Sequence, residues 1–324
     1  MTVSVKETIN QAIEQHPFGQ QPAELYEPIR YIMALGGKRL RPTLTLLAYQ
    51  LLRDNALPPS VLHPALAVEV FHNFSLMHDD IMDQAPLRRG KPTVHERWDA
   101  NVAILSGDVM LVKAYELLLQ SEADKLPGVL AAFNQCATEV CEGQQWDMNF
   151  QTRSEVSEED YLRMIRQKTA VLLGFSLQLG GLLADADQET VQALYELGVN
   201  IGIGFQLKDD LLDVYADQAK FGKQPGGDII VNKKTFLLIK ALEKAEGEQH
   251  VRLVDWLSRP SFDKEEKVKE VTALYDQLYV RTLTEQAMNG YFQQGLNQLT
   301  RIEVEESRKQ PLRTFIEDLI HREK

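Results

Sequence analysis

Two aspartate clusters of the same form provide the strongest chemical signal in this chain of 324 residues. They occupy residues 79–83 and 209–213, and each reads DDxxD at the end of an apolar stretch with helical periodicity. On a helix, positions i and i+4 differ by about 40° and roughly 6 Å of rise, so the first and last aspartates of each cluster share a face. Neighbouring carboxylates repel one another unless cations neutralise them, and Mg²⁺ takes its ligands from a few carboxylates, phosphate oxygens and water. The clusters therefore predict a magnesium–diphosphate site.

Two basic elements accompany the clusters. The segment Arg88-Arg89-Gly90-Lys91-Pro92 follows the first cluster, and its glycine and proline indicate a loop in which paired guanidinium groups can hold phosphate oxygens. The segment Gly36-Gly37-Lys38-Arg39-Leu40-Arg41-Pro42 brings three cations to a flexible backbone, but it lacks the nucleotide P-loop pattern. A solvated charge run, or a helix end followed by a basic turn, would also explain each segment alone. Beside paired aspartate motifs, both segments favour anion binding.

Helices are expected to position these residues. Apolar residues recur at spacings of three and four, and alternating β-branched runs are nearly absent. The helical stretches are 43–53, 65–82, 106–120, 128–148, 159–183, 188–215 and 267–298. Glycine and proline lie between them, and no linker separates two halves. The sequence therefore predicts a single all-α domain over residues 1–324.

Composition narrows the class of protein. A hydrophobic content of 44% is enough for a sizeable core, and the net charge of −12 argues against nucleic-acid binding. Two cysteines are typical of a reducing compartment rather than a disulfide scaffold. The N-terminal residues lack the layout of a signal peptide, and no apolar run is long enough for a transmembrane segment. We expect a cytoplasmic protein with no nucleic-acid partner.

Several single residues allow two interpretations. Lys168 lies in an apolar stretch, where an unpaired ammonium is costly, although its side chain could extend to the surface. His72 lies seven residues before Asp79, on the same helical face, and buried histidines are often structural. The glycine-rich loop 222–228 could close over a substrate.

The motifs together resemble the trans-isoprenyl diphosphate synthases, also called the polyprenyl synthetase family. The resemblance rests on GGKRLRP, HNFSLMHDDIMD followed by RRG, QKTA, FQLKDDLLD and FGKQPGGDI, which occur in the family's order between about residues 30 and 240. It implies an all-α isoprenoid-synthase bundle with a central apolar cavity, usually a homodimer. One departure is Asn232, since glycine often precedes the lysine that Lys233 matches.

The resemblance also implies roles for individual residues. A cluster of about three Mg²⁺ ions, for which Mn²⁺ can substitute, would bind Asp79, Asp80, Asp83, Asp209 and Asp213 together with the allylic diphosphate. The allylic substrate would contact Arg88, Lys168, Thr169, Gln206, Lys223 and Lys233. Isopentenyl diphosphate would contact Lys38, Arg41, His72 and Arg89. The residues expected to act in catalysis are Asp79, Asp83, Lys168, Thr169, Gln206 and Asp209.

The implied reaction is prenyl transfer, and the residues before Asp79 bear on its product. The allylic C–O bond ionises, the double bond of isopentenyl diphosphate attacks the cation, and loss of a proton leaves a chain longer by five carbons.

Phe71, Phe74 and Ser75 lie eight, five and four positions before Asp79, within an arc of about 100°. The family links an aromatic residue at −5 and a small one at −4 to short products. We predict C15 to C20 products, with geranylgeranyl diphosphate ahead of farnesyl diphosphate. Phe74 could also be ordinary core packing.

Three other interpretations compete. A terpene cyclase shares the fold and one DDxxD, but it needs neither GGKRLRP nor a second such motif. A metal phosphohydrolase could use His78-Asp79, with His63, His72 and His95 as further ligands, but this leaves the second cluster unexplained. A non-catalytic subunit of a heteromeric synthase would usually lose one aspartate motif, and both are intact here.

Overall fold

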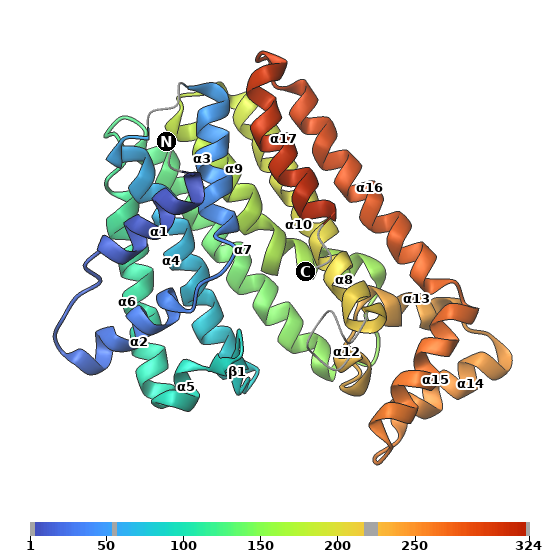
Figure 1. The fold of residues 1–324 in the computed structure, drawn as a ribbon. Helices are drawn as coiled ribbons and strands as arrows, with labels where there is room; N and C mark the ends of the chain where they lie inside the picture. The colour runs from blue at the N-terminus through green and yellow to red at the C-terminus, as the bar shows by residue number, and fades with distance from the viewer. Residues whose placement is uncertain (1–3, 54–56, 217–225, 322–324) are drawn as a thin grey trace. The chain divides into compact units, whose positions relative to one another are not determined.

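A computed structural model describes residues 4–53, 57–216 and 226–321. Nearly all the secondary structure in these residues is helical, and the exception is one short β-hairpin (Figure 1). The predicted all-α class is confirmed. Within the described ranges, no helix combines the length and the apolar character needed to cross a membrane.

Contacts divide the chain into two compact units. Unit 1 comprises residues 1–137, 172–195 and 299–314, and unit 2 comprises residues 138–171, 196–298 and 315–324. Five helices, α7, α9, α10, α16 and α17, contribute residues to both units. The prediction of a single domain stays a prediction.

Unit 1 contains the first aspartate motif and the basic segments. Its elements are α1 (Val5–Gln15), α2 (Ala23–Ala34), α3 (Leu40–Leu52), α4 (Pro59–Met82), β1 (Leu87–Arg88), β2 (Lys91–Pro92), α5 (Val94–Arg97), α6 (Ala100–Leu118) and parts of α7 (Leu126–Thr152), α9 (Val171–Leu183), α10 (Gln188–Tyr215), α16 (Val280–Arg301) and α17 (Glu306–His321). Helix α4 begins with Pro59, whose fixed φ suits a first helical turn. It packs against α3 and α6 and buries side chains around most of its circumference, as expected for a central helix.

Unit 2 contains the second aspartate motif. Its elements are α8 (Glu158–Ile165), the π-helix η1 (Arg166–Ala170), α12 (Gly227–Ile230), α13 (Phe236–Lys244), α14 (Gly247–Ser258), α15 (Lys264–Gln277) and the remaining parts of the five shared helices. A hydrophobic cluster around Leu237, Leu253, Val271 and Leu274 joins α13, α14 and α15. This cluster makes the region after residue 250 part of the fold that supports α12.

Two predicted helical stretches differ from the structure. Residues 159–183 form three segments, because a π-helix separates α8 from α9. Residues 267–298 contain a break between α15 and α16, where Tyr279 has a left-handed φ of 56°. A side chain is strained in that conformation and cannot continue a right-handed helix, so α15 ends there.

Candidate active site

The first aspartate motif lies at the end of α4, and a β-hairpin follows it. Asp79 and Asp80 occupy the last turn of the helix, and Asp83 is its C-cap. In the hairpin, Leu87 pairs with Pro92 and Arg88 with Lys91, so Arg89 and Gly90 form the two-residue turn. Both turn residues have positive φ, 52° and 74°, as a type I′ turn requires. This tight turn directs Arg88 back to the helix.

Asp80 and Arg88 form a buried bidentate ion pair. Arg88 Nε donates to Asp80 Oδ1 and Oδ2 at 2.9 and 2.8 Å, and Nη2 donates to Oδ1 at 2.6 Å. The Asp80 side chain is only 3% exposed. Its oxygens are therefore engaged by a guanidinium, whereas Asp79 and Asp83 are more exposed and share a helical face. A metal-binding role for Asp80 and a diphosphate-binding role for Arg88 stay predictions, and the pair places Asp80 behind the outer aspartates.

A cluster of arginines surrounds His72 on α4. Arg41 Nη1 donates to His72 Nε2 at 3.2 Å, and Arg89 donates to the carbonyl oxygen of Gly36. Gly37 lies against the Arg89 guanidinium, and its φ of 135° is a conformation that favours glycine. The structure thus brings together three residues predicted to bind isopentenyl diphosphate, namely Arg41, His72 and Arg89.

The electrostatics of this cluster favour an anion. Burial and the positive charges of Arg41, Arg89, Arg88 and Arg39 hold the pKa of His72 well below its usual value. The imidazole is therefore neutral at physiological pH and accepts the Arg41 hydrogen bond. Burial also lowers the pKa of Arg41 to about 10, and its buried Nε has no hydrogen-bond partner among the described residues. A bound anion would offset this excess of positive charge.

Arg39 is structural rather than part of the anion site. Its left-handed backbone, with φ 51°, begins α3, and its Nη1 lies 2.6 Å from Glu69 Oε1. Nη2 donates to the Met33 carbonyl oxygen at 2.8 Å. Arg39 is 5% exposed. This buried pair fixes the backbone between Lys38, which is exposed, and Arg41.

The second aspartate motif lies on α10 in unit 2, and Asp210 is its buried member. Asp210 is 2% exposed, accepts a hydrogen bond from the Tyr161 hydroxyl, and accepts another from Gln206 Nε2 at 3.3 Å. Thr169 Oγ1 in turn donates to Gln206 Oε1 at 3.3 Å. Burial raises the pKa of Asp210 to about 7. The predicted residues Thr169 and Gln206 therefore belong to one hydrogen-bond network.

The outer aspartate Asp213 is tied to the segment that carries Lys233. The backbone N–H of Asp228 donates to Asp213 Oδ2 at 2.9 Å, and the N–H of Gly226 donates to the Asp213 carbonyl at 2.6 Å. Lys233 Nζ lies 3.5 Å from Asp228 Oδ1. Asp209 is exposed on α10, and Lys223 lies outside the described residues.

The π-helix places Lys168 beside α7. Lys168 Nζ donates to Asp147 Oδ2 at 2.6 Å, so its ammonium is paired. At Gly143 the backbones of α7 and η1 approach closely, since a Cβ there would lie 2.2 Å from the Lys168 backbone nitrogen. Extra-residue turns of this kind often occur at functional sites.

Sequence reasoning missed three partners of the predicted residues, namely Asp147, Tyr161 and Asp228. Asp228 stands inside the FGKQPGGDI motif, which could have identified it. Asp147 and Tyr161 carry no motif, because their partners lie 21 and 49 positions away. A rule that every buried charge needs a partner predicts that such residues exist but not where they lie.

The aspartate carboxylates suit a hard cation that also takes ligands from a bound diphosphate. Among residues 4–53, 57–216 and 226–321, no three histidine, cysteine or acidic side chains cluster closely enough to hold a metal alone. Carboxylates at helical spacing fit Mg²⁺, which usually takes only one or two of them and completes its shell with phosphate oxygens and water. The motifs therefore fit a metal that binds together with a diphosphate.

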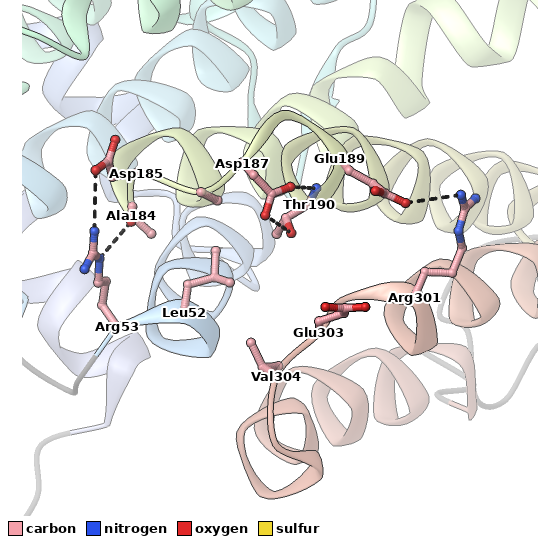
Figure 2. Close-up of a pocket in the computed structure, with 11 residues that line it drawn as sticks. Leu52, Arg53, Ala184, Asp185, Asp187, Glu189, Thr190, Arg301, Glu303 and Val304 are labelled. Carbon is pink, nitrogen blue, oxygen red and sulfur yellow. Dashed lines mark hydrogen bonds and ion pairs between the residues drawn. The ribbon is translucent and has the colours of Figure 1, made fainter.

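A surface pocket of unit 1 is unrelated to these residues. It has a volume of about 490 Å³ and contains none of the predicted site residues (Figure 2). Its charged groups satisfy one another, with Arg53 3.8 Å from Asp185 and Arg301 3.9 Å from Glu189. Asp187 caps the start of α10 through Thr190. We attribute this pocket to helix ends that meet at the surface.

Comparison with known proteins now decides the family. The polyprenyl synthetase family model matches residues 22–275. The chain belongs to the polyprenyl synthetase family. It is 44% identical over 226 residues to a geranylgeranyl diphosphate synthase of Methanosarcina mazei, covering 69% of each chain. It also resembles a crystal structure of a geranylgeranyl pyrophosphate synthase, with 40% identity, a TM-score of 0.93 and complete coverage of both chains.

A third similar protein was solved with a divalent metal and a diphosphate bound. A polyprenyl synthase from Caulobacter crescentus, complexed with calcium and isoprenyl diphosphate, is 26% identical with a TM-score of 0.82, covering 99% of this chain and 94% of that one. The predicted family, fold class and enzyme class, a transferase of prenyl groups, are confirmed. The roles of the individual site residues stay predictions.

We predict that Gly143→Ala lowers the free energy of unfolding by about 2 kcal/mol or more, because its methyl group would collide with the backbone of η1. Turnover should fall with it, since Lys168 must move. Gly290→Ala is the matched control, because that helical glycine in unit 2 has no neighbour within 4 Å. Chemical denaturation measures both variants, and equal stability of the two would contradict the close-approach argument.

Proposed function

We propose that the protein condenses isopentenyl diphosphate with allylic diphosphates to a short-chain prenyl diphosphate, with geranylgeranyl diphosphate favoured. The observation that carries this proposal is the cluster of arginines around a neutral His72, whose positive charge suits a second diphosphate. A condensation of two diphosphates needs a second anion site, and ionisation of one substrate does not. The names of the relatives agree with a product of this length.

Different residues bind the two substrates. Arg41 and Arg89 hold the diphosphate of the attacking substrate, together with the exposed Lys38. By the resemblance to the family, Asp79 and Asp83 of unit 1 and Asp209 and Asp213 of unit 2 would bind Mg²⁺, and Arg88, Lys168 and Lys233 would bind the allylic diphosphate. Bound Mg²⁺ supplies positive charge that stabilises the departing diphosphate.

No side chain needs to act as a nucleophile. The allylic C–O bond breaks with its electron pair on the diphosphate, and the double bond of isopentenyl diphosphate forms the new C–C bond. The proton released from the product passes to the departing diphosphate. We assign the stabilisation of positive charge on carbon to oxygen atoms of Thr169 and Gln206, and the hydrogen bonds that join these two residues to Asp210 support the assignment.

Specific contacts argue against the phosphohydrolase alternative. His78 Nε2 donates to the Ile104 carbonyl oxygen at 3.2 Å, and its ring lies against Gly107 of α6. His72 is engaged by Arg41. A farnesyl diphosphate synthase remains the nearest alternative, since it uses the same residues and differs in the length of its product.

The proposed function is tested by incubating the protein with Mg²⁺, isopentenyl diphosphate and each of the C5, C10 and C15 allylic diphosphates. We expect a C20 diphosphate as the main product by chromatography of the dephosphorylated chains. Asp79→Ala should lower turnover roughly 100- to 1000-fold, because a ligand of the metal that stabilises the leaving diphosphate is lost. Asp124→Ala, on an exposed loop of unit 1, should retain full activity. Hydrolysis without condensation would refute the proposal.

The second part of the proposal concerns product length. Phe71 is 1% exposed and packs against Phe74 and Phe133, with ring centroids 5.5 and 5.1 Å away. Phe74 is only partly buried, and Ser75 Oγ donates to the His72 carbonyl at 2.8 Å. Phe71 therefore belongs to the aromatic core of unit 1, and we assign the floor of the product cavity to Phe74.

We predict that Phe74→Ala lengthens the product by at least one isoprene unit, because the bulky ring that stops the growing chain is removed. Product chromatography measures the length. Trp256→Ala is the control, since it deletes a buried aromatic side chain from the core of unit 2. An unchanged product in the folded Phe74→Ala variant would exclude Phe74 as the floor.

The homodimer forms part of the same proposal. Leu105 and Val112 on α6 and its C-cap residue Leu119 recur every seven residues and are 58%, 55% and 53% exposed, and Ile104 adds to this stripe. Contiguous exposed apolar residues mark interaction surfaces. We assign the stripe to a second copy of the chain. Cys136 and Cys141 do not form a disulfide, which agrees with the proposed cytoplasmic location.

We expect wild-type protein to show twice the chain mass by light scattering. The double variant Leu105→Glu with Val112→Glu should shift it toward the monomer, because charges would be buried at the interface. Val251→Glu is the control, since Val251 on α14 is 67% exposed, more than either substituted residue. A dimer that persists in the double variant would place the interface elsewhere.

A further inference from the structure

Lys267 is a buried lysine that no motif explains. It lies on α15 with its residue 0% exposed, and its ammonium is 4.1 Å from the centroid of the Phe262 ring. Its Nζ donates to the Ile230 carbonyl oxygen at 3.2 Å and to Asn232 Oδ1 at 2.6 Å. Burying an ammonium against neutral oxygens is costly, and burial lowers the pKa of this lysine. The two oxygen atoms are the hydrogen-bond partners that offset this cost.

Asn232 is the residue at which this chain departs from the family pattern. Its φ of 55° lies in the left-handed region, which favours glycine and which asparagine tolerates better than most residues. Asn232 Oδ1 accepts from Lys267, and Nδ2 donates to the Leu257 carbonyl oxygen at 2.9 Å. Glycine could adopt the same backbone but could form neither side-chain bond. Asparagine thus joins α12 to both α14 and α15.

The segment held in this way carries site residues. Lys233 follows Asn232 directly, its backbone N–H donates to the Asp228 carbonyl at 3.0 Å, and its ammonium pairs with the Asp228 carboxylate. Asp228 in turn donates its backbone N–H to Asp213 of the second motif. At the other end of the segment, a Cβ on Gly226 would lie 2.6 Å from Val268 of α15. Helix α15 therefore contacts the segment 226–233 at both ends.

We propose that Lys267 and Asn232 are positioning residues, which hold Lys233 and Asp228 in the arrangement that binds the allylic diphosphate. The expected effect on kinetics rests on the proposed function, whereas the expected effect on the rigidity of segment 226–233 does not. In this chain, the Lys267–Asn232 hydrogen bond provides the rigidity that a bare glycine turn would lack. The region after residue 250 thereby acquires a role in the reaction.

Hydrogen exchange tests the structural part without any substrate. In Lys267→Met, which keeps the unbranched shape of the side chain and removes its charge, amides of residues 226–234 should exchange about tenfold faster, because a charge-assisted hydrogen bond is lost. Lys269→Met is the matched control, since Lys269 is exposed on the same helix. Asn232→Gly should behave as Lys267→Met does. Unchanged exchange in both variants would overturn the inference.

Kinetics test the functional part. In Lys267→Met, kcat/KM for the allylic diphosphate should fall about tenfold, while KM for isopentenyl diphosphate stays unchanged. The double variant Lys267→Met with Lys233→Ala should be no slower than Lys233→Ala alone, because the two residues act through one contact. The positioning role would be overturned if the two substitutions lowered kcat/KM by the product of their separate effects. It would also be overturned if Lys267→Met lowered kcat/KM equally for both substrates. Absence of prenyl transfer in the wild type would refute the proposed function and leave the exchange result standing.

Discussion

Each aspartate motif contains one buried carboxylate whose oxygens must be bound by donors within the protein. Asp80 is bound by Arg88, and Asp210 is bound by Tyr161 and Gln206. An unpaired charge in these positions would cost several kcal/mol, so the partner is as necessary as the aspartate. Because the helix fixes the angle between successive residues, anchoring the second aspartate also fixes the directions of the first and fifth. Both motifs are thus oriented by a buried second aspartate, although different residues bind it in each motif.

The arginine cluster of unit 1 follows the opposite principle. Arg41 and Arg89 lie near a neutral His72, and the buried carboxylate of Glu69 pairs with Arg39. The cluster keeps a surplus of positive charge whose repulsion an anionic ligand would relieve. Neutral imidazole can accept from Arg41 without adding a further charge. The arrangement separates residues that hold the backbone from those that can hold a diphosphate.

In unit 2, backbone geometry does much of the positioning. The π-helix and Gly143 bring Lys168 beside Asp147, and the left-handed Asn232 turns the chain before Lys233. Each feature requires a particular residue type, since a side chain at Gly143 would collide with η1 and most side chains at Asn232 would be strained. Supporting contacts from α14 and α15 explain why a charged helix late in the chain contains a fully buried lysine.

Periodicity and motif order by themselves determined the all-α class, the family and the two aspartate motifs of this protein. These features could be predicted because they are local, as DDxxD and helical spacing are read within a few residues. Only the tertiary structure decided which aspartate of each motif is buried, and which distant residues bind it. It also decided that Lys168 is paired with Asp147, 21 positions away, and that Lys267 bonds to Asn232, 35 positions away. Such partners are selected by the electrostatic cost of burying charge, and this cost depends on the packing of distant helices rather than on any pattern along the chain.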